Sequence, residues 1–190
     1  MADKTETDDA LLMAAISGGD GNALRLLIRK YRPLVFRTAL RIMCRSCEAE
    51  DITQDVFIKV WQQAGRYNGQ SSLSTWLYRI TANLSLDKLR RRKLIPSWIS
   101  NGMSGKNGDR TEISAEDRLI ASEEWEIFVK ASEKLSPKQR MIFTLKEIEE
   151  LDTEEVTRIT GMNADQIKSN LYLARRTVRK IIMEYNHGKE

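Results

Sequence analysis

Apolar residues recur at the three- and four-residue spacing of an α-helix along most of the chain, and glycines separate the periodic segments. In the first half this pattern predicts helices at about 9–17, 22–44, 49–64 and 74–93. In the second half it predicts helices at about 115–134, 137–149, 153–160 and 163–185. No run of alternating apolar residues bounded by turn dipeptides predicts a β-hairpin. The expected fold is all-α, with two small helical domains joined by a flexible linker.

Glycine and proline mark the boundary between the two predicted domains. Pro96, Gly102, Gly105 and Gly108 fall in one stretch that is also rich in Ser, Asn and Asp, a composition typical of an irregular linker. We therefore expect a first domain at 1–95, a linker at 96–114 and a second domain at 115–190. Within the first domain, Pro33 is expected to bend or interrupt its helix, because proline removes a backbone donor.

The apolar rows of the first domain predict which helix faces are buried. The residues expected to face the core are Leu24, Leu27, Ile28, Tyr31 and Val35 in the second helix, Ile52, Val56, Val60 and Ala64 in the third, and Leu73, Leu77, Ile80 and Leu84 in the fourth. The other faces of the third and fourth helices are largely polar.

The stretch from 152 to 182 has the pattern of a helix-turn-helix. Val156 and Ile159 face inward on a short first helix, Gly161 permits the left-handed backbone of a tight turn, and Met162 fills the corner. The second helix is expected to bury Ile167, Leu171, Ala174, Val178 and Ile181. Ala164, Asp165, Lys168, Ser169, Tyr172 and Arg176 are then left on or near its open face.

These residue types suit the reading of duplex DNA. The N-terminal residues of a recognition helix reach base edges in the major groove, and Lys168 suits the acceptors of guanine. Arg175, Arg176, Arg179 and Lys180 are placed for phosphates. An ordinary α-hairpin with a basic outer face would show the same pattern, so this alternative stays open.

The fourth predicted helix carries a second candidate surface. Trp76, Arg79, Asn83, Asp87 and Arg90 fall on one side of it, and cations are dense between positions 88 and 93. An aromatic ring beside a basic run suits single-stranded or opened nucleic acid, because bases stack on the ring and the backbone follows the cations. A solvated helix face with a core tryptophan is the alternative.

The third predicted helix presents Asp51, Gln54 and Asp55 on a polar surface. Two carboxylates could indicate the metal site of a nuclease, but the sequence places no third ligand or histidine beside them. We therefore predict no catalytic residue, no metal site and no cofactor. Cys44 and Cys47 form a single Cys-x-x-Cys without a second pair, which favours incidental thiols.

Charge and composition narrow the class of protein. The chain of 190 residues is 41% hydrophobic and 31% charged, and its longest purely apolar run, Ala10–Ile16, is far too short to span a membrane. The acidic N-terminus is unlike a signal peptide, so we expect a cytoplasmic protein. Residues 1–95 hold 16 Lys/Arg against 10 Asp/Glu, whereas residues 109–155 hold 7 against 14. Such clustering favours a nucleic-acid partner for the basic segments.

Both predicted domains resemble those of bacterial RNA polymerase sigma factors, specifically the small extracytoplasmic-function (ECF) group. Where that family has an Ala-Glu-Asp-Leu-x-Gln-Glu-x-Phe-type stretch, this chain has Ala49-Glu50-Asp51-Ile52-Thr53-Gln54-Asp55-Val56-Phe57. A Trp-Leu-x-x-Ile-x-x-Asn-x-x-x-Asp-x-x-Arg-Arg pattern is matched by Trp76-Leu77, Ile80, Asn83, Asp87, Arg90 and Arg91. The family's second domain is matched by Leu135, Gln139-Arg140, Gly161, Ile167-Lys168-Ser169, Leu171 and Ala174-Arg175.

The resemblance implies partners and roles. Asp51, Ile52, Gln54 and Asp55 would dock on the β′ clamp helices of core RNA polymerase. Trp76, Arg79, Asn83, Arg90 and Arg91 would bind the minus-ten element of promoter DNA, and the minus-thirty-five element would be read by Asn163, Ala164, Asp165, Lys168, Ser169, Tyr172, Arg175 and Arg176. The second domain would also meet the β flap, and an anti-sigma factor, soluble or membrane-bound, would be a further partner. The protein itself would not insert into a membrane.

A self-sufficient helix-turn-helix transcriptional regulator is the alternative from another class. Such a protein would need a ligand pocket or a dimer interface outside its DNA-binding helices. A sigma factor instead needs the exposed surface of Asp51, Gln54 and Asp55.

Overall fold

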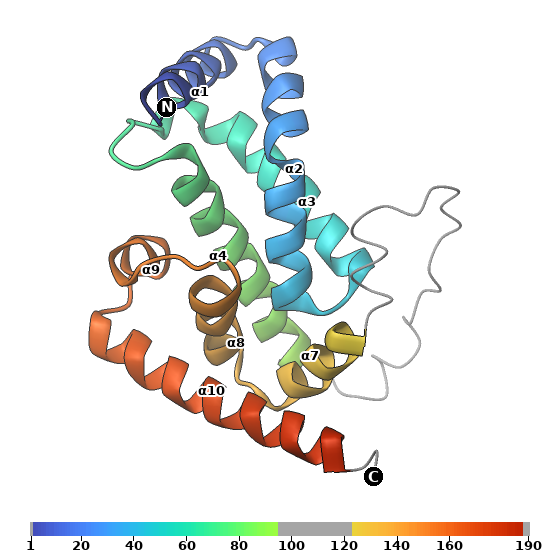
Figure 1. The fold of residues 1–190 in the computed structure, drawn as a ribbon. Coiled ribbons are helices and arrows are strands. Elements are labelled where there is room, and N and C mark those ends of the chain that lie inside the picture. The colour runs from blue at the N-terminus through green and yellow to red at the C-terminus, as the bar shows by residue number, and fades with distance from the viewer. Residues whose placement is uncertain (1, 95–122, 188–190) are drawn as a thin grey trace.

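The computed structural model describes residues 2–94 and 123–187, and both parts are built from helices without a strand among the described residues (Figure 1). An N-terminal unit consists of α1 (Ala2–Ser17), α2 (Gly21–Met43), α3 (Ser46–Gln63), η1 (Ala64–Arg66) and α4 (Leu73–Leu94). A C-terminal unit consists of α7 (Glu123–Lys134), α8 (Pro137–Phe143), η3 (Thr144–Ile148), α9 (Thr153–Thr160) and α10 (Ala164–His187). The all-α prediction is confirmed, and the predicted linker at 96–114 lies outside the described residues.

Side-chain caps explain where several helices begin. The Asp20 carboxylate accepts from the backbone N–H groups of Asn22 and Ala23 at the start of α2. Ser136 and Gln139 form a reciprocal capping box at the start of α8, next to Pro137 in the first turn. These bonds satisfy N–H groups that have no acceptor within their own helix.

Three helices differ from the sequence prediction. α1 begins seven residues earlier than the predicted Asp9, in a segment that contains no glycine or proline to stop it. α2 runs unbroken through Pro33, which is exposed, so the carbonyl that loses its donor lies on the solvent side. The helix predicted at 137–149 instead changes at Thr144 into the π-helical turn η3, and Glu150 then adopts a left-handed backbone with φ 54°.

The core of the N-terminal unit follows the predicted apolar rows. Ile52, Val56, Val60 and Ala64 of α3 and Leu73, Leu77 and Ile80 of α4 are buried against Leu27, Tyr31 and Val35 of α2. Leu24, Ile28 and Leu84 are only half-buried, at the edge of this core. At the other end of the unit, the buried Asp9 of α1 accepts from Tyr31 at 2.5 Å and from Lys30 at 2.6 Å.

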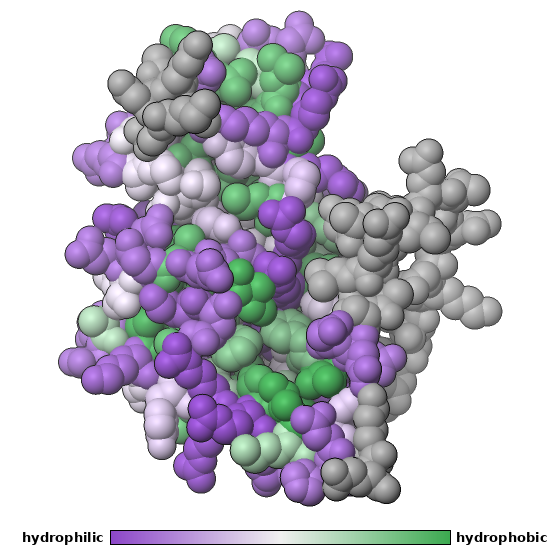
Figure 2. Space-filling view, in the orientation of Figure 1, coloured by the Kyte–Doolittle hydropathy of each residue, from purple (hydrophilic) through white to green (hydrophobic). Residues whose placement is uncertain are grey.

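The two units pack against each other. α8 and α9 lie along α4 (Figure 1), and the buried apolar residues of both units form one continuous cluster. Hydrophilic side chains cover much of the face seen in Figure 2. Within the described ranges, no helix is long and apolar enough to cross a membrane.

Candidate polymerase and nucleic-acid interfaces

α9 and α10 form the predicted helix-turn-helix, and side chains and one glycine determine its turn. Asp152 and Glu155 form a capping box at the start of α9. Gly161 ends the helix with φ 70°, and its N–H donates to the carbonyl of Thr157 at 2.8 Å. Asn163 accepts from the N–H of Gln166 at 2.9 Å and opens α10. The turn is therefore held by local bonds that the sequence itself specifies.

The buried side of this motif leaves the predicted DNA-reading side open. Val156, Ile159, Ile167, Leu171 and Ala174 are buried, as predicted. Val178 and Ile181 were expected to be buried as well, but they are only half-buried. The residues that the structure leaves exposed on α10 and just before it include Asn163, Ala164, Asp165, Lys168, Ser169, Tyr172 and Arg176.

Arg175 differs from its neighbours on the same helix. Its guanidinium donates to Glu147 of η3 at 2.7 Å, although the side chain is largely exposed. The hydrogen bond to Glu147 and the charge of that carboxylate raise the pKa of Arg175. A phosphate would have to replace Glu147 as the acceptor, whereas Arg176 is exposed without an ion pair among the described residues.

The polar side of α4 has an anchored end and a free end. The Trp76 ring is half-buried and packs on Tyr67 at 5.6 Å between ring centroids, with a tilt of 55°. The Tyr67 hydroxyl donates to the carbonyl of Ser71, which closes the loop before α4. Arg79 and Asn83 are exposed one and two turns further along. This arrangement leaves the edge of an aromatic platform beside a cation and an amide.

The basic run at the end of α4 is divided between two roles. Lys88 pairs with Asp51 at 2.8 Å and Arg92 with Glu48 at 3.3 Å, so these two cations hold α4 against α3. Arg90 and Arg91 are exposed, with Arg90 3.6 Å from Asp87 on its own helix. The two arginines that were predicted to bind DNA therefore lie exposed to solvent.

On α3 the structure exposes Asp51, Gln54 and Asp55 but corrects the placement of Ile52. Ile52 is 1% exposed and belongs to the core, because it lies on the same side of the helix as Val56. Ile52 therefore supports the polar surface from beneath and offers no contact to a partner.

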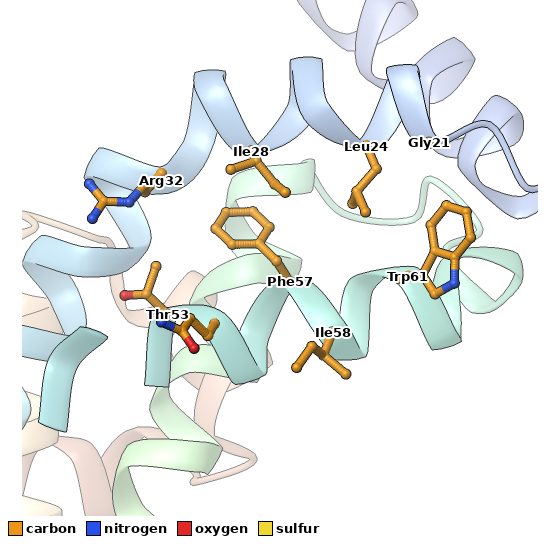
Figure 3. A pocket seen from close by; sticks show the side chains of 9 residues that line it. Gly21, Leu24, Ile28, Arg32, Thr53, Phe57, Ile58 and Trp61 are labelled. Atoms are coloured by element: carbon orange, nitrogen blue, oxygen red, sulfur yellow. The ribbon is translucent and has the colours of Figure 1, made fainter. Parts of the chain in front are cut away.

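An apolar groove beside this polar surface was missed by the sequence analysis. It lies between α2 and α3 and has a volume of about 590 Å³ (Figure 3). The residues that line it include Leu24, Ile28, Arg32, Gln54, Phe57, Ile58 and Trp61. Ile58 is 54% exposed and Trp61 41%. The sequence does contain a feature that could have predicted this groove. Gln54, Ile58 and Trp61 are spaced by four and three residues and so form a second row on α3 beside the core row.

Metal-ligating side chains and thiols are the remaining candidate chemistry in the described residues. No group of three His, Cys, Asp or Glu side chains there could hold a metal ion. Cys44 and Cys47 are free thiols. Burial raises the pKa of the Cys44 thiol, which makes it a poor nucleophile.

Comparison with known proteins identifies the two units. The sequence matches the family description Sigma-70 region 2 over residues 27–95 and Sigma-70, region 4 over residues 125–178. It is 30% identical over 176 residues to the ECF RNA polymerase sigma-E factor of Escherichia coli (strain K12), covering 90% of this chain and 92% of that protein. The chain belongs to the ECF sigma factors. It is a promoter-specificity subunit of RNA polymerase, and the self-sufficient regulator is not favoured.

Two solved structures of similar fold are both of complexes. CnrH in complex with the cytosolic domain of CnrY superposes with a TM-score of 0.66 at 18% identity, covering 93% of this sigma factor and 98% of that chain. The sigma factor RpoE of Bartonella quintana, in complex with the anti-sigma factor NepR, superposes with a TM-score of 0.64 at 23% identity, covering 84% and 96%. At these identities the likeness concerns the fold.

Proposed function

We propose that this sigma factor divides its work among three surfaces: α3 and the adjoining groove for core polymerase, the polar side of α4 for the minus-ten element, and α10 for the minus-thirty-five element. The domain limits in this proposal are 1–95, 96–114 and 115–190. The observation that carries this proposal is that α4 and α10 each expose a basic face. The two helices belong to units that match different regions of one family. The polymerase core carries out the chemistry, and the sigma factor contributes recognition.

The polymerase surface combines a polar and an apolar part. Gln54 and Asp55 are exposed on α3, and Gln54 also borders the groove that ends at Trp61. A partner helix with one basic and one apolar stripe, of the kind present in a coiled coil, would satisfy both parts. We assign this surface to the β′ clamp helices, and the acidic residues of the C-terminal unit to the β flap.

Association with purified core polymerase, followed by run-off transcription, tests the assignment. The double substitution Gln54→Ala with Asp55→Lys should abolish core association while the thermal unfolding midpoint stays close to that of the wild type. Both side chains are exposed, so the free energy of unfolding should change by less than about 0.5 kcal/mol. Asn186→Ala with Glu184→Lys makes the same chemical changes on the exposed end of α10 and should leave association intact. Association unchanged by the first pair would refute the α3 assignment.

We also infer that an anti-sigma factor regulates this protein. The support is that one structural neighbour, RpoE, was solved in complex with an anti-sigma factor, and the other, CnrH, in complex with the cytosolic domain of CnrY. An anti-sigma factor that covers the groove between α2 and α3 would exclude polymerase by direct competition. Two results together would support a shared site. Core polymerase and the anti-sigma factor should compete for this protein, and Trp61→Ala should weaken the binding of each.

A further inference from the structure

The two units are joined by a polar cluster centred on Glu149, just after the π-helical turn η3. Its carboxylate accepts from Arg41 of α2 at 2.6 Å and from the hydroxyl of Tyr78 of α4 at 2.7 Å. The Glu149 side chain is only 8% exposed. Burial, and then the hydrogen bond to Glu149, raises the pKa of Tyr78 well above its usual value near 10. One carboxylate of the C-terminal unit thus connects two helices of the N-terminal unit.

A second polar link lies at the end of α2. Arg140 of α8 is 6% exposed and donates to the carbonyl of Ile42 at 3.1 Å. The same guanidinium lies 3.9 Å from the Cys44 sulfur. Burial lowers the pKa of Arg140, because the charged form loses its hydration.

One side of α4 is shaped for this contact. Tyr78, Ala82, Ser85 and Leu89 are spaced by four, three and four residues, and all four are buried. Because Tyr78 meets Glu149, this row is the side on which the C-terminal unit packs. It is separate from the core row of Leu77 and Leu84 and from the exposed row of Arg79 and Asn83. α4 therefore has three faces: one for its own core, one for the other unit and one for solvent.

Some polar atoms buried near the contact between the two units have no hydrogen bond to offset their loss of hydration. The hydroxyls of Ser85 and Thr144 and the Nε atom of Arg140 are buried without a hydrogen-bond partner among the described residues. Each unpaired buried polar group opposes packing, because it has lost its hydration without gaining a hydrogen bond. Because the same contact also contains the continuous apolar cluster, the cost of the unpaired polar groups and the burial of apolar surface oppose each other there.

The proposed function requires separation. Two elements about 25 base pairs apart lie about 85 Å apart on duplex DNA at 3.4 Å per base pair. A compact chain of 190 residues has a radius of gyration of about 16 Å and is about 40 Å across. The 28 residues from 95 to 122 would span about 90–100 Å at full extension, enough to bridge the two elements once the units part.

We propose that Arg41, Tyr78 and Glu149 form a latch that holds the C-terminal unit against α4 in the free protein, and that this latch opens before one molecule spans both promoter elements. The consequence for promoters rests on the proposed function, whereas the latch is a property of the free chain. The solvent faces of α4 and α10 are exposed in the docked arrangement. The latch therefore controls the distance between the DNA-binding faces and does not cover them.

Thiol labelling of the free protein tests the latch directly. In a Cys47→Ser background, Cys44 is the remaining thiol of the chain, and Arg140 of the C-terminal unit lies against it. Glu149→Gln removes the charge but preserves the shape, and it should speed labelling of Cys44 by an aromatic disulfide about tenfold, as expected for loss of a charged hydrogen bond. The matched control is Glu147→Gln, because Glu147 pairs with Arg175 inside the C-terminal unit. This control should label at the wild-type rate.

Charge reversal separates a latch from a general loss of stability. Arg41→Glu alone and Glu149→Arg alone should each speed labelling and raise the radius of gyration measured by small-angle X-ray scattering. The two substitutions combined should restore slow labelling and the compact radius. Equal labelling of the Glu149→Gln and Glu147→Gln proteins would overturn the proposal, as would fast labelling in the double reversal or an unchanged radius in the single variants.

The promoter consequence has its own readout. With core polymerase at limiting concentration, Glu149→Gln should speed formation of the promoter complex relative to the wild type, which keeps Arg175 paired with Glu147 as the variant does. Failure of every variant, wild type included, to direct run-off transcription would refute the proposed function but leave the labelling result as it stands. Fast labelling with no gain in the rate of complex formation would refute the link between the latch and the promoter.

Discussion

Replacing Asn83 with alanine tests whether α4 holds the opened DNA strand. Asn83 is exposed in the middle of α4, and its side chain has no hydrogen-bond partner in the described part of the chain. The substitution therefore removes no internal contact, and alanine is the better helix former by about 0.5 kcal/mol. We expect the free energy of unfolding of the variant to lie within about 0.5 kcal/mol of the wild type.

The expected loss appears only in the promoter complex. One turn before Asn83 stands Arg79, and two turns before it the Trp76 ring packs on Tyr67, so a base placed there meets a ring, a cation and an amide. Losing the amide leaves one base edge unpaired, which costs about 1–3 kcal/mol. At about 1.4 kcal/mol per factor of ten, the opening equilibrium should fall roughly 5- to 150-fold. Core association and binding to the upstream duplex should be unchanged.

Permanganate footprinting of the melted strand measures this opening. Thymine reactivity near the minus-ten element should fall in the Asn83→Ala complex and stay at the wild-type level with Asn186→Ala, an exposed asparagine on α10. Wild-type reactivity in the Asn83→Ala complex would refute the assignment of this side of α4. A large loss of thermal stability would instead contradict the exposed position that the structure gives to Asn83.

Three further outcomes are expected. Lys168→Ala should relax the sequence preference at one or two base pairs by about 1–3 kcal/mol. Arg179→Ala should weaken binding evenly across sequences and flatten the salt dependence of binding. Similar profiles of the two variants on a panel of point-mutated promoters would contradict the face assigned to α10. Gly161→Ala should cost about 1–2 kcal/mol of unfolding free energy in a thermal melt, because the backbone there has φ 70° while an added Cβ meets nothing within 4 Å; a larger loss would imply a clash. Burial and Asp9 raise the pKa of Tyr31 above its usual 10, so the contribution of Tyr31 to stability is fully present below about pH 10 and is lost as pH rises beyond it. The free energy of unfolding should therefore fall less steeply above about pH 10 in Tyr31→Phe than in the wild type, and an equal slope would exclude Tyr31 as a cause.

The sequence alone determined the local features of this sigma factor. Helix starts at Ser136 and Asp152 and the turn at Gly161 depend on side chains within a few residues of the backbone groups they satisfy. The exposed faces of α4 and α10 followed from helical periodicity, because a residue's angle around a helix depends only on its position in the chain. These features were predictable without knowing what lies across from each helix.

The tertiary structure decided everything that depends on two distant segments. Periodicity identified one buried row on α4, but the second row through Tyr78 and Ser85 has a partner only because the C-terminal unit packs there. The groove that ends at Trp61 required the separation of α2 and α3, which no single helix encodes. Glu149 lies 108 residues from Arg41, and the π-helical turn before it altered the helical register that the sequence predicted. Local hydrogen bonds determine where each helix begins and ends. Pairings such as Glu149 with Arg41 form only when whole helices pack together. The contacts between these distant segments must then offset the loss of hydration and of conformational entropy.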